Sequence, residues 1–95
     1  IYAVPGIDAV FIGPNDLAAT MRGPDGTPPS KEAFEAAIAR VREAAATCGI
    51  ASGLHVYSAA DAQRRIAEGF RFLAVGSELK FMVQAAADLA KAVHP

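Results

Sequence analysis

Short apolar runs alternate along the chain with longer segments in which apolar residues recur every three or four positions. Three of the runs, Ala9–Ile12, Ala51–Val56 and Phe72–Val75, are rich in apolar residues and lack a regular polar–apolar alternation. Runs of this kind are typical of strands that are covered on both faces, as in parallel sheets. The pattern therefore predicts three buried, parallel strands.

A helical period of apolar residues separates the first two strands. Residues Lys31–Cys48 carry a single apolar stripe, formed by Phe34, Ile38, Val41, Ala45 and Cys48. Ser30 is suited to cap the beginning of this helix, and Gly49 to end it. From its place on the stripe, we expect Cys48 to be packed and chemically inert.

Two more helices follow the second and third strands. Ala59–Glu68 is predicted to begin after a Ser58 cap and to end at Gly69, and about Glu78–Val93 to begin after Ser77. The stripe of the last helix consists of Leu79, Met82, Val83, Ala86, Leu89 and Val93. The expected order is thus strand–helix, three times over.

A weak internal repeat supports this order. The segments Gly6–Gly13 and Gly69–Gly76 share a frame of glycine, an apolar residue, a charged residue, a strand and a second glycine. Three βα units cannot close an eight-stranded barrel. The fold class is therefore α/β, either as an open three-stranded sheet or as the last part of a barrel.

Composition narrows the possible functions. With 95 residues, of which 53% are hydrophobic and 20% charged, the chain is one globular domain at most. A net charge of −1 gives no reason to expect nucleic acid or an anionic membrane as a partner. No apolar run approaches a membrane span, and no signal peptide is visible. The single cysteine excludes an internal disulfide. These features fit a cytoplasmic protein, and a chain that starts with Ile1 is expected to be part of a longer one.

The residues Gly13, Pro14, Asn15 and Asp16 follow directly after the first predicted strand. Ligands of α/β proteins bind beyond the carboxyl ends of parallel strands, so this carboxylate lies where chemistry is usual. Backbone N–H groups in such a turn can also hold a carboxylate or a phosphate. The alternatives are that Asp16 caps a short helical turn, or that the four residues form an ordinary β-turn.

Two further polar residues are expected near the same end of the sheet. His55 ends the second strand, where it is a wall residue or an acid–base group without a visible partner. Glu78 opens the last helix, a position that acidic residues favour for structural reasons. The polar loop Gly23–Pro29 follows the Asp16 turn and either covers a site or is merely solvated.

The segment Gly6–Met21 resembles the HpcH/HpaI aldolase family, the class II, metal-dependent 2-oxo acid aldolases related to citrate lyase β-subunits. Gly69–Leu79 resembles the final strand and helix of that family, and Gly49–His55 its seventh strand. The resemblance implies a (β/α)₈ TIM barrel, of which residues 1–95 would form about strands six to eight.

The same resemblance implies a role for each residue of the turn. Asp16 corresponds to a metal-binding carboxylate of the family, which uses Mg²⁺ or Mn²⁺. The amides of Asn15 and Asp16 would bind the carboxylate of a 2-oxo acid, and Gly13 and Pro14 would present them. His55 would line the aldehyde pocket, where relatives often have an apolar residue. The partner glutamate of this carboxylate, a substrate-binding arginine and the acid–base histidine are expected upstream, so the catalytic residues are unknown here.

The activity implied by the resemblance is cleavage of a 4-hydroxy-2-oxo acid to pyruvate, or a similar oxo acid, and an aldehyde. We expect it from a full-length homo-oligomer, a trimer or hexamer, and not from these 95 residues alone. Alternatives are a phosphoenolpyruvate- or pyruvate-binding enzyme, a malyl- or citryl-thioester lyase, and a non-catalytic truncated scaffold. The expected partners are small molecules, with neither nucleic acid nor a membrane among them.

Overall fold

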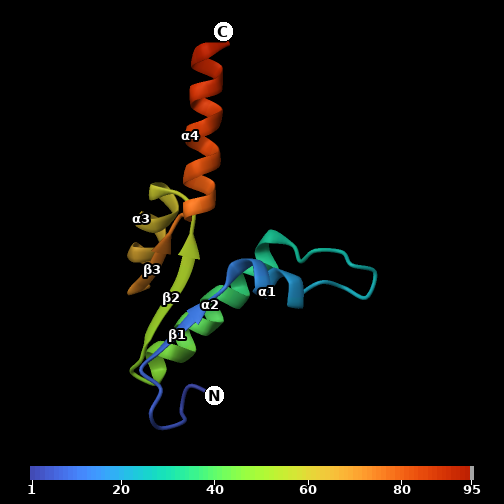
Figure 1. The fold of residues 1–95 in the computed structure, drawn as a ribbon. Coiled ribbons are helices and arrows are strands. Elements are labelled where there is room, and N and C mark those ends of the chain that lie inside the picture. The colour runs from blue at the N-terminus through green and yellow to red at the C-terminus, as the bar shows by residue number, and fades with distance from the viewer. Residues whose placement is uncertain (95) are drawn as a thin grey trace.

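The structure is a computed structural model that describes residues 1–94 (Figure 1). Its elements are β1 (Ala9–Ile12), α1 (Pro14–Thr20), α2 (Lys31–Thr47), β2 (Ala51–Val56), α3 (Ala59–Glu68), β3 (Phe72–Val75) and α4 (Glu78–Val93). The three strands form one parallel sheet in the order β1-β2-β3. The predicted α/β fold with three successive βα units is confirmed, and the strand bounds coincide with the apolar runs.

The hydrophobic core lies between one face of this sheet and the helices. Helix α2 packs on β1 and β2, and α3 packs on β3. Ile12, Leu54 and Leu73 stand side by side in register across the three strands, on the face that the helices cover. Ile38 from α2, Val56 at the end of β2 and Phe70, which precedes β3, complete the buried cluster. This core fixes the sheet against the helices.

The opposite face of the sheet carries a row of three residues in register. Phe11 and Phe72 flank Gly53, and their ring centroids are 5.2 Å apart. A Cβ atom on Gly53 would lie 2.1 Å from the Phe72 carbonyl oxygen, so this position requires glycine. Both rings remain about half exposed. The sequence predicts strands that are covered on both faces. Within residues 1–94 helices cover only one face of the sheet, so no element of this part of the chain covers the face that carries Phe11 and Phe72.

Three serines begin the long helices as predicted. The Oγ atoms of Ser30, Ser58 and Ser77 accept hydrogen bonds from the backbone N–H three residues later, at 3.1, 3.1 and 3.3 Å. Each bond satisfies an N–H group that the helix itself leaves unpaired. Gly69 ends α3 with a φ of 107°, in the left-handed region that glycine adopts without strain. The first residues of these three helices could therefore be predicted from the capping serines in the sequence.

The expectation that Cys48 lies on the packed stripe is wrong. Helix α2 ends at Thr47, and Cys48 is its exposed C-cap residue. The buried part of the stripe ends with Ala45. The helical period predicted the right face, but it could not reveal that the last turn extends beyond the sheet.

A buried arginine joins α2 to α3. The guanidinium of Arg65 donates to both carboxylate oxygens of Glu35 at 2.8 Å and to Glu68 at 3.0 Å. Arg65 is only 5% exposed, and its Nε atom has no partner within residues 1–94. Hydrogen bonds from Arg65 hold the pKa of Glu35 below its usual value of 4.5. The helices are therefore clamped by a bidentate ion pair as well as by apolar contact.

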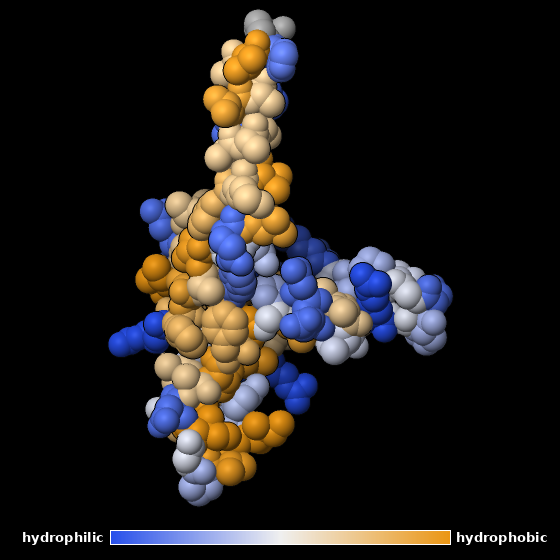
Figure 2. Space-filling model, in the orientation of Figure 1, coloured by the Kyte–Doolittle hydropathy of each residue, from blue (hydrophilic) through white to orange (hydrophobic). Residues whose placement is uncertain are grey.

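Helix α4 projects away from the sheet instead of packing along it (Figure 1). Its large apolar side chains are more than half exposed, namely those of Leu79, Phe81, Met82, Val83, Leu89 and Val93. Figure 2 shows several strongly hydrophobic surface areas along this projecting helix. The predicted stripe exists, but the described part of the chain does not bury it. No helix among residues 1–94 has the length and apolar character needed to cross a bilayer.

Replacing Arg65 with methionine should destabilise the fold. Arg65→Met removes the clamp and leaves two carboxylates facing an apolar side chain, so we expect a loss of about 1–3 kcal/mol in the free energy of unfolding. Arg64→Met is the matched control, because Arg64 is half exposed and reaches Glu35 only at 3.7 Å. Its loss should stay below about 0.5 kcal/mol. Urea unfolding measures both, and equal losses would contradict the clamp.

The contribution of the clamp should depend on pH. A carboxylate whose pKa is lowered by folding stabilises the native state above its unfolded pKa, and this stabilisation is lost as the pH falls through the lowered value. Because the pKa of Glu35 lies below 4.5, the difference between wild type and Arg65→Met should be constant near neutrality. It should shrink as the pH drops below about 4.5. Urea midpoints between pH 7 and pH 3.5 test this, and a difference that grows on acidification would refute it.

Candidate functional site

The turn after β1 is the beginning of a helix. Gly13 is the N-cap of α1, and Pro14 occupies the first helical position, which suits the fixed φ of proline. The carbonyl of Gly13 accepts a hydrogen bond from the N–H of Leu17 at 2.8 Å. Of the two backbone conformations left open by the sequence, a helical first turn is the one found.

Asp16 lies in this first turn, with its side chain exposed and folded back towards the end of β1. Its Oδ2 atom would be 2.9 Å from a Cβ atom placed on Gly13, so the glycine leaves the space that the carboxylate occupies. The Asp16 carboxylate makes no capping hydrogen bond and no ion pair within the described chain. The interpretation of Asp16 as a helix cap is therefore wrong, and its oxygens remain available to a ligand.

Two backbone N–H groups stand beside this carboxylate. Asn15 and Asp16 are in the first turn of α1, where a helix has no acceptors of its own. The partial positive charge of a helix N-terminus favours an anion at this point. The turn thus combines one carboxylate with donors suited to an anionic group.

His55 emerges at the same end of the sheet as the turn. Both belong to a hollow of about 490 Å³ at the ends of β1 and β2, lined by Phe11, Gly13, Pro14, Asn15, Asp16, His55 and Tyr57. The parallel register explains this arrangement, because Ile12 pairs with Leu54. Gly13 follows Ile12 and His55 follows Leu54, so these two residues lie next to each other. The five predicted binding residues Gly13, Pro14, Asn15, Asp16 and His55 therefore meet in one place, whereas Glu78, also expected near this end of the sheet, is not among the residues that line it.

The imidazole of His55 is held from two sides. Its Nε2 atom lies in contact with the carbonyl oxygen of Gly76, which can only accept, so this nitrogen carries the proton. The ring also stacks on Tyr57, with centroids 4.5 Å apart and planes inclined by 24°. Within residues 1–94 no carboxylate pairs with the ring. The two contacts fix the orientation of the His55 ring, which forms one side of the hollow.

Tyr57 and Lys80 are neighbours of the site that sequence reasoning missed. The ammonium of Lys80 lies 4.0 Å from the centroid of the Tyr57 ring. Tyr57 was detectable in principle, since it directly follows β2 and so belongs, with His55, to the end of the strand where a site is expected. The contact of Lys80 with Tyr57 could not be predicted from the sequence, because it depends on the direction in which α4 leaves the sheet.

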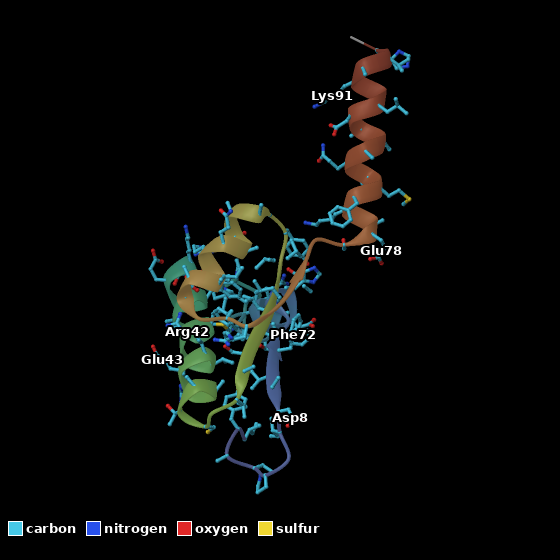
Figure 3. The ribbon with its side chains drawn as sticks, turned by 90° about the vertical axis from the view of Figure 1, so that its left-hand side faces the viewer. Asp8, Arg42, Glu43, Phe72, Glu78 and Lys91 are labelled. Atoms are coloured by element: carbon cyan, nitrogen blue, oxygen red, sulfur yellow. The ribbon has the colours of Figure 1, made fainter. Side chains whose placement is uncertain are left out.

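The carboxylate of Asp16 fits one position of a divalent-ion site. Mg²⁺ is held by one or two carboxylates together with water and substrate oxygens. Across residues 1–94 there is no group of three or more His, Cys, Asp or Glu residues that could hold a metal ion. Asp8 lies at the opposite end of the sheet and Glu78 at the base of α4, outside the residues that line the hollow (Figure 3). The chain therefore offers one ligand and not a complete site.

Comparison with known proteins identifies a family. The model of the HpcH/HpaI aldolase/citrate lyase family matches residues 1–85. A hydroxypyruvate/pyruvate aldolase of Paraburkholderia phytofirmans is 42% identical over 86 residues, which are 90% of this chain and 32% of that protein. A 2-keto-3-deoxy-L-rhamnonate aldolase of Salmonella schwarzengrund is 41% identical over 87 residues, which are 90% of this chain and 31% of that protein.

A solved structure shows the same fold. The crystal structure of an HpcH/HpaI aldolase/citrate lyase family protein from Burkholderia cenocepacia J2315 matches with a TM-score of 0.80 and 31% sequence identity. The match covers 100% of this chain and 36% of that chain. The present chain thus spans about a third of the length of the relatives that it matches.

The junction between β3 and α4 should be sensitive at Gly76. Its φ of 76° is left-handed, and an added Cβ atom would lie 2.3 Å from Cζ of Phe81. We expect Gly76→Ala to cost about 1–2 kcal/mol in the free energy of unfolding. Gly49→Ala is the control, since Gly49 has a φ of 71° with nothing within 4 Å of the added atom. In urea unfolding Gly76→Ala should lose more, and the reverse order would show that Phe81 does not pack there.

Proposed function

Because the chain belongs to the HpcH/HpaI aldolase/citrate lyase family, we propose that it is one part of a longer, metal-dependent aldolase. The proposed reaction is cleavage, or the reverse condensation, of a 4-hydroxy-2-oxo acid into pyruvate or a similar oxo acid and an aldehyde. The observation that carries the proposal is the position of Asp16. Its unpaired carboxylate folds over Gly13 at the carboxyl end of a parallel strand, beside the first N–H groups of α1.

The proposal gives each residue of the turn a role. Asp16 would supply one oxygen ligand to Mg²⁺ or Mn²⁺, and the N–H groups of Asn15 and Asp16 would bind the carboxylate of the oxo acid. A bound divalent ion supplies Lewis-acid stabilisation for the negative charge that develops as the carbon–carbon bond breaks. Gly13 and Pro14 set the direction of the turn, and His55 with Tyr57 bounds the hollow on the aldehyde side.

The remaining machinery has to come from outside these residues. A single carboxylate binds a divalent ion poorly, and the hollow offers no second one. We therefore propose that residues 1–95 alone have no aldolase activity. The exposed apolar side chains of α4 support the further proposal that the full-length enzyme is a homo-oligomer, a trimer or hexamer.

A second candidate is cleavage of a malyl or citryl thioester. The family description joins aldolases with citrate lyase, so the same carboxylate could serve either substrate class. The names of the two relatives above favour the aldolase reaction. A phosphoenolpyruvate-binding enzyme and a non-catalytic scaffold are the outcomes left if no carbon–carbon cleavage is found.

The role of Asp16 can be tested in the full-length protein. Asp16→Asn keeps the size of the side chain but removes its charge, so kcat/KM for pyruvate release from 4-hydroxy-2-oxo acids should fall at least about 100-fold. Calorimetric titration with Mn²⁺ should show weaker binding. Asp8→Asn is the matched control, because Asp8 precedes the same strand at its opposite end (Figure 3).

The outcomes separate the candidates. Metal-dependent cleavage that survives in Asp8→Asn and is lost in Asp16→Asn would support the aldolase and the role of the carboxylate. A wild type that binds Mn²⁺ but releases no pyruvate would favour the thioester or phosphoenolpyruvate reactions, to be assayed with malyl-coenzyme A and citryl-coenzyme A. If the wild-type protein binds no metal, the non-catalytic scaffold is the alternative that remains.

A further inference from the structure

One cation stands next to the hollow without an acidic partner. Lys80 lies in the first turn of α4, and its ammonium is 4.0 Å from the centroid of the Tyr57 ring. No carboxylate within residues 1–94 forms an ion pair with Lys80. An aromatic ring attracts an ammonium and orients it, but it does not neutralise the charge. The positive charge of Lys80 is therefore held in place and still available.

Tyr57 connects this charge with the candidate site. Its ring lines the hollow that contains Asp16, stacks on His55 and contacts Lys80. His55 is in turn held by the carbonyl of Gly76, just before α4 begins. The ammonium of Lys80 is thus placed by its contact with Tyr57, a residue of the hollow, and the backbone that carries Lys80 begins next to the Gly76 carbonyl that His55 contacts.

The hollow has an electrostatic polarity as a result. The carboxylate of Asp16 and the N–H groups of α1 stand at the end of β1, whereas the ammonium of Lys80 lies against the ring of Tyr57, which directly follows β2. If the oxo acid occupies the first end, the aldehyde extends towards the second. An anionic group on that aldehyde would approach Lys80, whereas a neutral group would gain nothing from it.

We propose that Lys80, positioned by Tyr57, is a specificity-determining residue that favours acceptor aldehydes carrying an anionic group. This inference rests on the proposed aldolase function and adds a recognition element for the aldehyde. It concerns discrimination between acceptors and not the chemical step, because Lys80 lies beyond Tyr57 and is not among the residues lining the hollow.

The test is the condensation of pyruvate with paired acceptors by the full-length enzyme with Mn²⁺. Glyoxylate is compared with glycolaldehyde, and glyceraldehyde 3-phosphate with glyceraldehyde, so that the two pairs distinguish a carboxylate from a phosphate. The readout is the ratio of kcat/KM for the anionic acceptor to that for its neutral partner. Lys80→Gln should lower this ratio about fivefold in at least one pair, and Lys80→Arg should retain most of it.

Further variants separate recognition from structure. Lys91→Gln, at the other end of α4, removes the same charge and should leave the ratio and the activity unchanged. Tyr57→Phe keeps the ring and should retain the preference, whereas Tyr57→Leu should lower it as Lys80→Gln does. Added salt should reduce the wild-type ratio, because the pair is near the surface and is screened.

Two results would overturn the inference in distinguishable ways. If the wild type condenses pyruvate with aldehydes but Lys80→Gln leaves both ratios unchanged, Lys80 does not select the acceptor, although the aldolase proposal stands. If the wild type uses none of the four acceptors and releases no pyruvate from 4-hydroxy-2-oxo acids, the proposed function fails and the inference fails with it.

Discussion

The parallel pairing of β2 with both of its neighbours is the constraint on which the rest of the structure depends. Among the strands of residues 1–94, only β2 has a ladder on each side, and its register aligns Ile12, Leu54 and Leu73 on the face that the helices cover. Because all three strands run the same way, their following turns meet at one edge. The Gly13 turn, His55 and Gly76 are neighbours for this reason, although they are far apart in the sequence. The register of β2 with its two neighbours thus determines both the packing of the core and the grouping of the site residues.

Much of the fold follows from local chemistry. The bounds of the strands were readable from apolar runs, and three serines marked the helix starts. The position of Asp16 beyond β1 was also predictable, because strand direction decides which end receives the turn. Cys48 was misplaced, since a helical period says which face is apolar but not how far the covering sheet extends.

What the sequence could not reveal depends on tertiary geometry. The clamp between Arg65 and Glu35 joins residues 30 positions apart, and an arginine in a polar helix gives no sign that it will be buried. The same holds for Lys80 and Tyr57, whose contact exists only because α4 leaves the sheet in one direction. The direction in which the Asp16 carboxylate points is likewise a matter of the space beside Gly13. These are contacts between side chains from separate elements, for which a single sequence carries no periodic signal.

The attachment of α4 through one short junction has a mechanical consequence. Its 16 residues form a rod about 24 Å long, joined to the sheet near Gly76, and the described chain reaches 55 Å in its longest dimension. A rod held at one end amplifies any rotation at its base: a tilt of about 10° would displace the far end by roughly 4 Å over that length. His55 touches the carbonyl of Gly76 and Tyr57 contacts Lys80, so the geometry of the hollow and the direction of the rod are coupled at the base of α4. Small adjustments at the rim of the hollow would therefore be transmitted as large displacements at the tip of α4.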